Sequence, residues 1–347
     1  LVVVAFRLAI EKIFEFVIQL YHQAHDNKLY LLALILLYAF IVFFVGQMIA
    51  KEPNAKGSGI PQVEAELKGM MQLQWWPVLW RKFIGGSLTI ASGLMLGREG
   101  PSIQLGAVTA KGIAEGLKAS KMEKRSLIAS GAAAGLAAAF NAPIAGLLFV
   151  VEEVYHQFSR LVWVSALAAS ITANFISLHV FGLTPVLQMP EHLSVLELRQ
   201  YWIYMALGLF LGLAGYFYEI VILRIQHLYQ FLSKMLPLPA QYQSLYAFML
   251  IIPIGYFLPE LLGGGHHLIL ELPHLQPSLM TLLFYLLIRF VWSMISYGSG
   301  LPGGIFLPIL TLGSLLGLSF GQLAFDVGWI GQDQMNLFIV LGMAGFF

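Results

Sequence analysis

Two residues that could do acid–base chemistry, Arg98 and Glu99, lie side by side within an otherwise apolar stretch. The stretch runs from Gly93 to Pro101 and reads GLMLGREGP. Charged side chains at membrane depth cost several kcal/mol unless they are paired, hydrated or coordinating another group. The pair therefore favours a functional site. The alternative is a loop at the membrane surface, in which the glycines supply only turns.

Glu99 could couple the movement of two ions. A carboxylate at the mouth of an anion site competes with the anion when it is ionised and withdraws when it is protonated. Helix N-termini can form such a site, because they present unpaired N–H groups and a partial positive charge. Three starts that contain glycine and proline, 57–61, 97–101 and 303–308, could converge on one anion. A buried lysine is not needed, and it would hold chloride too tightly for release.

The spacing of glycine and proline around Glu99 returns later in the chain after a shift of 207 residues, the difference between Gly93 and Gly300. The matched pairs are Gly93 and Gly300, Gly97 and Gly304, Pro101 and Pro308, Gly106 and Gly313, and, upstream, Lys82-Phe83 and Arg289-Phe290. Such paired interruptions in the two halves of a membrane protein indicate broken helices that meet at a midplane site. The second copy has Ile305-Phe306-Leu307 in place of Arg98-Glu99-Gly100, so the scaffold is repeated while the charge belongs to one half.

Ser58 lies in the segment Gly57-Ser58-Gly59-Ile60-Pro61. The glycines free the backbone, and Pro61 suits the first turn of a helix. The Ser58 hydroxyl could donate to an anion. The alternative is that it caps the helix in the ordinary way.

The composition is that of a polytopic membrane protein. Hydrophobic residues make up 59% of the 347 residues and charged residues 11%, far from the balance of soluble domains. Three stretches, 29–50, 126–151 and 290–325, carry no charge, and about 20 apolar residues suffice to cross a bilayer as a helix. We therefore predict an all-α polytopic membrane protein, built from two inverted repeats of broken and tilted transmembrane helices.

We expect a first transmembrane repeat at 1–180, a linker at 181–199 and a second, C-terminally incomplete repeat at 200–347. The chain looks trimmed at both ends, since it begins without a methionine and stops inside an apolar run. A short polar turn is expected at 22–28. The positive-inside rule places one basic loop in the cytoplasm; this loop contains Lys118, Lys121, Lys124 and Arg125.

Enzyme and metal chemistry are poorly supported. Glu153 and His156 have the Glu-x-x-His spacing of di-iron helices, but the other match, at Glu271 to His274, contains a proline. The pair His266-His267 follows three glycines and is expected to lie in a loop. No Cys, His-Glu-x-x-His or Gly-x-Ser-x-Gly motif occurs, so no metal, cofactor or enzymatic activity is expected. The net charge of +1 gives no indication of a nucleic-acid partner.

Three motifs together resemble the CLC family of chloride channels and chloride/proton exchangers. They are Gly57-Ser-Gly-Ile-Pro61, Gly97-Arg-Glu-Gly-Pro101 and Gly304-Ile-Phe-Leu-Pro308. The resemblance extends to the small-residue run from Gly131 that ends in Glu152-Glu153. It implies a homodimer in a lipid bilayer, with one anion pathway in each subunit.

The resemblance also implies roles for individual residues. Glu99 would be the outer gating glutamate and Glu153 the inner proton-transfer glutamate, while the Ser58 hydroxyl and the N–H groups of Ile305 and Phe306 would hold the central anion. The full set of expected anion-binding residues is Ser58, Gly59, Ile60, Arg98, Gly100, Gly304, Ile305 and Phe306. The family's coordinating tyrosine would lie beyond Phe347, and we do not expect the fragment alone to transport.

The function that these observations favour is chloride transport coupled to proton counter-transport, in a bacterial cytoplasmic membrane. An acid at position 153 favours an exchanger over a passive chloride channel of the same family. A further alternative is a membrane assembly subunit that does not transport, in which the repeats would serve packing and Glu99 would be salt-bridged to Arg98 or elsewhere.

Overall fold

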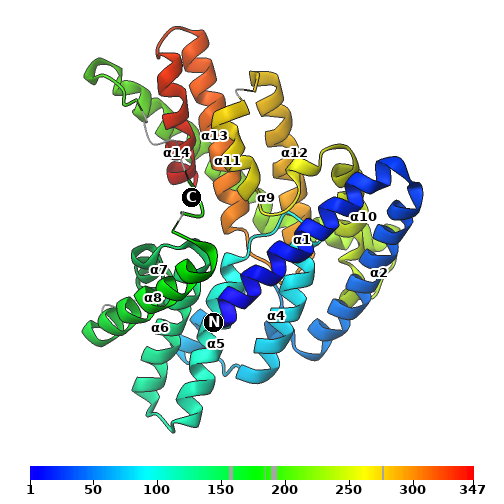
Figure 1. The fold of residues 1–347 in the computed structure, drawn as a ribbon, viewed down its shortest axis with the longest axis vertical. Helices are drawn as coiled ribbons and strands as arrows, with labels where there is room; N and C mark the ends of the chain where they lie inside the picture. Colours follow the sequence, from blue (N-terminus) through cyan, green and yellow to red (C-terminus); the bar gives the residue numbers. More distant parts are fainter. Residues whose placement is uncertain (156–158, 184, 189–193, 276) are drawn as a thin grey trace.

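The computed structural model describes residues 1–155, 159–183, 185–188, 194–275 and 277–347, and its regular structure in these ranges is helical (Figure 1). The first half contains α1 Val2–Asp26, α2 Lys28–Lys51, α3 Ile60–Lys68, α4 Trp75–Ala91, α5 Glu99–Gly116, α6 Lys121–Phe140, α7 Pro143–Phe149, a π-helical segment Val150–Tyr155 and α8 Arg160–Phe181. The second half contains α9 Trp202–Met235, α10 Leu245–Phe257, α11 His266–Leu275, α12 Leu279–Gly298, α13 Phe306–Asp326 and α14 Met335–Phe346.

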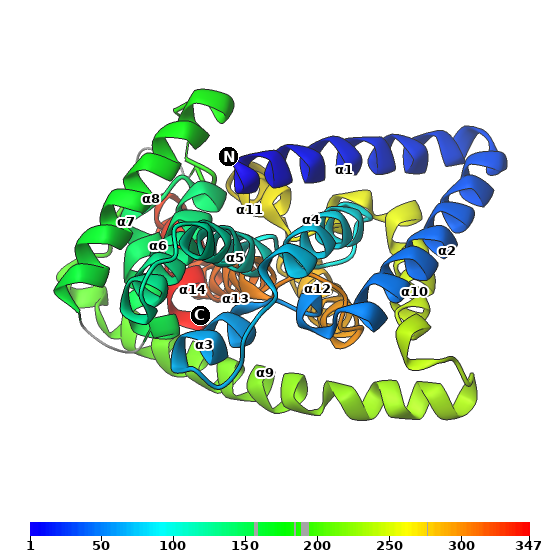
Figure 2. The ribbon, with the colours of Figure 1, turned by 90° about the horizontal axis from the view of Figure 1, so that it is seen from below.

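The two halves form an inverted repeat. The α5–α6 hairpin points to one end of the molecule and its counterpart, the α13–α14 hairpin, points to the opposite end (Figure 1). Seen from below, α1 and α9 run along opposite sides, with α5 and α13 between them (Figure 2). The shift of 207 residues found in the sequence therefore relates helices as well as motifs, which confirms the predicted fold class.

Five of the helices in the described ranges are long and apolar enough to cross a membrane, namely α2, α8, α9, α12 and α13. The charge-free stretch 29–50 forms α2 as a continuous helix. The stretch 126–151 is instead broken after Phe140, where Asn141 adopts a left-handed conformation with φ of 56°. The stretch 290–325 is broken between Gly298 and Phe306.

Two expectations about local structure are wrong. The polar turn predicted at 22–28 is shorter, because α1 continues to Asp26 and the chain turns at Asn27. The expected loop at His266-His267 is the start of α11. That helix has only 10 residues, but it buries an apolar face of Leu268, Ile269 and Leu272 in the main core. Burial of this apolar face stabilises α11, although its sequence is too short for its hydrophobic pattern to predict a helix.

Small residues allow α5 and α6 to pack closely. A Cβ built on Gly135 would lie 2.9 Å from the carbonyl carbon of Ser102, and one built on Gly106 would lie 3.1 Å from the Cα of Gly135. A side chain at either position would push the helices apart. The run from Gly131 therefore serves helix packing, as small residues do in membrane proteins.

The connection between the halves begins after α8 ends at Phe181, and α9 starts at Trp202. Positions 184 and 189–193 of the expected linker lie outside the described residues.

Candidate anion and proton site

Backbone hydrogen bonds join the three glycine-containing loops. Gly97 and Gly304 exchange two N–H···O bonds of 2.7 Å each and form an isolated antiparallel bridge. Gly57 donates to Gly300 O at 3.2 Å, and its own carbonyl accepts from Gly303 N at 3.0 Å. The three segments that were expected to converge do so, and main-chain atoms hold them together.

Ser58 lies against the beginning of α5. A Cβ on Gly100 would lie 2.8 Å from Ser58 Cβ and 3.0 Å from Ser58 O, so only glycine fits at position 100 without a shift of the backbone. The half-buried Ser58 hydroxyl accepts a hydrogen bond from Ile60 N at 3.3 Å. Ser58 is not the helix cap that the sequence allowed, because the N-cap of α3 is Gly59 and no side chain caps this helix. The hydroxyl hydrogen is not used in that bond and remains available to donate.

Gly59 has φ of +92°, a left-handed conformation that side-chain-bearing residues rarely adopt. The Gln104 side chain of α5 occupies the space that a Cβ on Gly59 would need. Gln104 is fully buried and donates to Asn54 O at 2.9 Å. The Ser58 loop is therefore fixed to α5 on both sides of Ser58, through Gly100 and through Gln104.

Glu99 is buried, with 1% of its surface exposed, and its Oε2 has no hydrogen-bond partner among the described residues. The side chain folds back over Gly97, where any Cβ would overlap Oε2. The first turn of α13 lies beside it, because the same Cβ on Gly97 would lie 3.3 Å from Leu307 Cβ. The Glu99 side chain, at the first residue of α5, thus lies where two helix N-termini meet.

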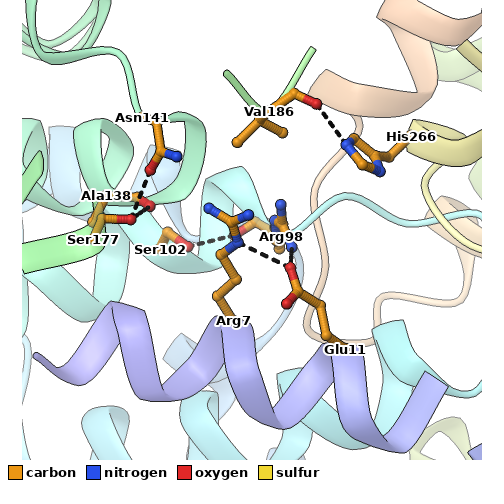
Figure 3. Close-up of polar contacts among 9 residues, drawn as sticks. All are labelled: Arg7, Glu11, Arg98, Ser102, Ala138, Asn141, Ser177, Val186 and His266. Carbon is orange, nitrogen blue, oxygen red and sulfur yellow. Dashed lines mark hydrogen bonds and ion pairs between the residues drawn. The ribbon is translucent and has the colours of Figure 1, made fainter. Parts of the chain in front are cut away.

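Arg98 does not neutralise Glu99. Its Nη1 donates to Glu11 Oε1 of α1 at 3.0 Å, and Arg7 Nε donates to the same oxygen at 2.9 Å (Figure 3). Both arginines thus pair with one oxygen of Glu11, and Glu99 has no ion-pair partner among the described residues. The assembly-subunit hypothesis expected Glu99 to be salt-bridged to Arg98 or elsewhere, and Glu99 forms no salt bridge among the described residues.

Ile305 and Phe306 supply N–H groups at the start of α13. Ile305 is the N-cap, and the first intrahelical bond runs from Ile309 N to Ile305 O at 2.9 Å. N–H groups before this bond lack helical acceptors. The Phe306 ring packs 5.2 Å from Phe140 and 6.0 Å from Phe149, measured between ring centroids. Phe306 therefore joins α13 to the α6–α7 break in the other half.

Glu153 lies apart from this cluster. It belongs to the π-helical segment Val150–Tyr155, and both it and Glu152 are exposed. The segment packs against α3 and α6, so it contacts the helix that begins at the Ser58 loop. None of the contacts given above for Glu99 involves Glu153.

Comparison with known proteins agrees with this architecture. Residues 35–347 match the model of the family described as "Voltage gated chloride channel". The chain belongs to the voltage-gated chloride channel family. It is 35% identical over 353 residues to the H(+)/Cl(-) exchange transporter ClcA of Salmonella arizonae, covering 99% of this chain and 73% of that protein. The ClcA protein of Salmonella paratyphi B matches to the same extent.

Solved structures give the same result. A slow cyanobacterial Cl⁻/H⁺ antiporter superposes with a TM-score of 0.88 at 27% identity, covering 99% of this chain and 85% of that one. A CLC-type fluoride/proton antiporter superposes with a TM-score of 0.75 at 21% identity, covering 99% and 84% of the two chains, and shows the shared fold alone.

Two buried cations hold the loops of this family member in place. Lys82 of α4 donates to Gly57 O at 2.6 Å and to Ala55 O at 3.2 Å. Its repeat partner Arg289 of α12 donates to Leu261 O at 2.9 Å, Gly263 O at 2.7 Å and Gly264 O at 2.6 Å. Gly57 and Gly264 are themselves 207 residues apart. The sequence matched Lys82 with Arg289 but assigned neither a role, and both stabilise the carbonyl-rich turn before a short helix.

The loop 261–265 is thus the second-half counterpart of the Ser58 loop, and Gly263 N donates to Gly93 O at 2.9 Å. A cavity of about 310 Å³ opens beside it. Its lining residues include Arg98, Glu11, Leu307, Gly265 and His266. His266 in turn contacts Val186 O at 2.6 Å (Figure 3). Leu307 lies beside Gly97, as the Glu99 carboxylate does, so this cavity lies near the buried carboxylate.

Proposed function

We propose that this membrane protein exchanges chloride for protons. The observation that carries the proposal is the buried Glu99 carboxylate, which has an unpartnered oxygen and lies where the N-termini of α5 and α13 meet. An anion is the ligand that such a place favours. The carboxylate fills it when ionised, and protonation removes the charge that holds it there. The curated relatives that are named as H(+)/Cl(-) exchange transporters support the same reading.

We assign the chloride site to the three joined loops. The Ser58 hydroxyl and the N–H groups of Ile305 and Phe306 hold the anion, and the small size of Gly100 and Gly304 lets the loops approach. Gly59 and Ile60 shape the turn at Ser58, and Arg98 raises the local positive potential near the cavity. No full positive charge contacts the anion in this arrangement, so that it can leave.

We further propose that residues 1–180 and 200–347 are the two repeats and that 181–199 links them. The protein works as a homodimer in a bacterial cytoplasmic membrane, where a ClcA-like exchanger would act. The many exposed apolar side chains of α9, among them Met205, Leu209 and Leu213, require lipid or protein contacts of this kind.

The test of the exchange mechanism is Glu153→Gln in the complete protein, reconstituted in liposomes. Glutamine keeps the size of the side chain but cannot carry a proton. We expect chloride flux to continue while chloride-driven proton uptake falls to the level of protein-free liposomes. Glu152→Gln, which changes the adjacent exposed acid, is the matched control and should keep proton uptake.

Unchanged proton uptake in Glu153→Gln would remove Glu153 from the proton pathway. Chloride flux without proton uptake in the wild-type protein would favour a passive channel. The absence of any chloride flux in the wild-type protein would favour the assembly-subunit alternative.

A second prediction concerns Ser58→Ala. The hydroxyl contributes one hydrogen bond to a charged acceptor, whose loss costs about 1.5–3 kcal/mol, or roughly a ten- to hundredfold loss of chloride affinity. Bromide and nitrate should bind in the wild-type protein and fluoride only weakly. Calorimetric titration of wild type and Ser58→Ala measures this, with Ser233→Ala on α9 as the control. Equal chloride affinity in Ser58→Ala and wild type would exclude Ser58 as a ligand.

A further inference from the structure

A second large cavity, of about 800 Å³, lies away from the chloride site, between the α3–α4 connection and the α5–α6 hairpin. Its walls carry more cations than anions. The charged lining residues are Lys111, Lys121, Lys124, Arg125, Glu66 and Glu115. The sequence placed this basic loop on the cytoplasmic side but gave it no role beyond orientation.

Both acidic side chains that line the cavity already have ion-pair partners. Glu66 Oε1 accepts from the buried Lys111 Nζ at 2.7 Å, and Glu66 Oε2 accepts from Leu73 N. Glu115 pairs with Lys124. Lys121 and Arg125 have no carboxylate partner within the described part of the chain, so the cavity keeps a net positive charge.

Arg125 is half-buried rather than extended into solvent. Its Nη2 lies 2.9 Å from the place that a Cβ would take on Gly69, the residue with φ of +77° that ends α3. The glycine therefore leaves room for the guanidinium beside the cavity. A guanidinium offers paired N–H donors that match the oxygens of a phosphate group.

The N-terminus of α4 also faces this cavity. Its N-cap Gln74 makes no side-chain capping bond, and its first turn, which contains no acid, lines the wall. Free N–H groups and the helix dipole add to the attraction for an anion. The partial positive charge at the start of α4 and the positive charges of Lys121 and Arg125 therefore attract an anion to the same cavity.

Apolar side chains at the rim indicate the source of the anion. Trp76 lines the cavity with 57% of its surface exposed, while Met70 and Met122, next to lining residues, are 78% and 75% exposed. Tryptophan at the membrane interface beside cytoplasmic cations is the setting in which anionic lipid headgroups bind. A soluble anion would gain nothing from this apolar rim.

We propose that the cavity between α4 and the α5–α6 hairpin binds the phosphate group of an anionic phospholipid. Arg125 and Lys121 hold the phosphate oxygens, the start of α4 contributes N–H groups, and Trp76 lies along the glycerol and upper acyl region. The Lys111–Glu66 pair closes the floor of the site. This site is separate from the chloride pathway, and its occupancy is measured without transport.

The experiment is native mass spectrometry of the purified protein with added phosphatidylglycerol or phosphatidylcholine. Each cation near a phosphate contributes about fivefold in affinity, so Lys121→Gln with Arg125→Gln should weaken phosphatidylglycerol binding about 25-fold. Glu115→Gln releases Lys124 and should strengthen it about fivefold. Lys51→Gln, an exposed lysine outside the cavity, is the control and should change nothing. Gel filtration confirms that each variant is folded.

Two outcomes would overturn the proposal. One is phosphatidylglycerol binding that is equal in the double variant and the wild type, and the other is phosphatidylcholine binding that matches phosphatidylglycerol. Inorganic phosphate is the remaining probe. If it binds to wild type but not to the double variant, and displaces phosphatidylglycerol, the ligand is a soluble phosphate and the lipid assignment is wrong.

Discussion

We expect Glu99→Gln to move chloride through liposomes without moving protons. Glutamine has the shape of a protonated glutamate but takes up and releases no proton, so it should leave the anion path open and break the coupling. The pH dependence of chloride flux should flatten for the same reason. Chloride and pH electrodes that record the same vesicle suspension measure both fluxes.

The control for Glu99→Gln is Glu15→Gln, which removes an exposed carboxylate of α1 that pairs with Lys12. Glu15→Gln should keep the wild-type ratio of chloride to proton. If Glu99→Gln also kept stoichiometric exchange, the proposed role of the buried carboxylate would be wrong. The uncompensated charge at the centre of the molecule would then need another explanation.

Arg289→Met should be the most destabilising single change among those considered. The fully buried Arg289 side chain donates to three carbonyl oxygens, those of Leu261, Gly263 and Gly264. Loss of a buried charged donor that leaves its acceptors unsatisfied costs about 3–5 kcal/mol. The thermal midpoint in detergent, followed by intrinsic fluorescence, reports this loss, together with a reduced yield of folded protein.

Arg224→Met, at an exposed position of α9, is the matched control and should leave the midpoint unchanged. Arg289→Lys should recover part of the stability, because Lys82 serves two carbonyls at the equivalent place in the other half. A midpoint in Arg289→Met equal to that of Arg224→Met would show that the loop 261–265 does not depend on Arg289.

The repeat was readable in the sequence because glycine and proline are required by backbone geometry. At Gly97 a side chain would overlap the Glu99 carboxylate, at Gly304 it would lie 3.3 Å from Gly100 N, and at Gly300 a φ of 68° disfavours any other residue. Because each position is required by its own local backbone geometry, the spacing of glycine and proline stays recognisable although the apolar residues around it differ between the two halves. The convergence of the three loops followed from that spacing, and the geometry agrees with it.

Other features could not be read because their causes are distant in sequence. Glu11 and Arg98 are 87 residues apart, and only the path of α1 across α5 brings them together. The helix α11 is short and begins with two histidines that follow three glycines, so its hydrophobic periodicity does not predict a helix before the core that buries it is known. The loop-binding role of Lys82 depends on carbonyl groups, which every residue carries and no sequence pattern marks.

The joint between Gly97 and Gly304 is made only of main-chain atoms. Its two hydrogen bonds therefore do not depend on the side chains at positions 98–99 and 305–306. The first half can carry Arg98 and Glu99 there, and the second half Ile305 and Phe306, without loss of the bonds that join the halves. A symmetric backbone can thus hold a chargeable group on one side alone, so that the two directions across the membrane are not equivalent.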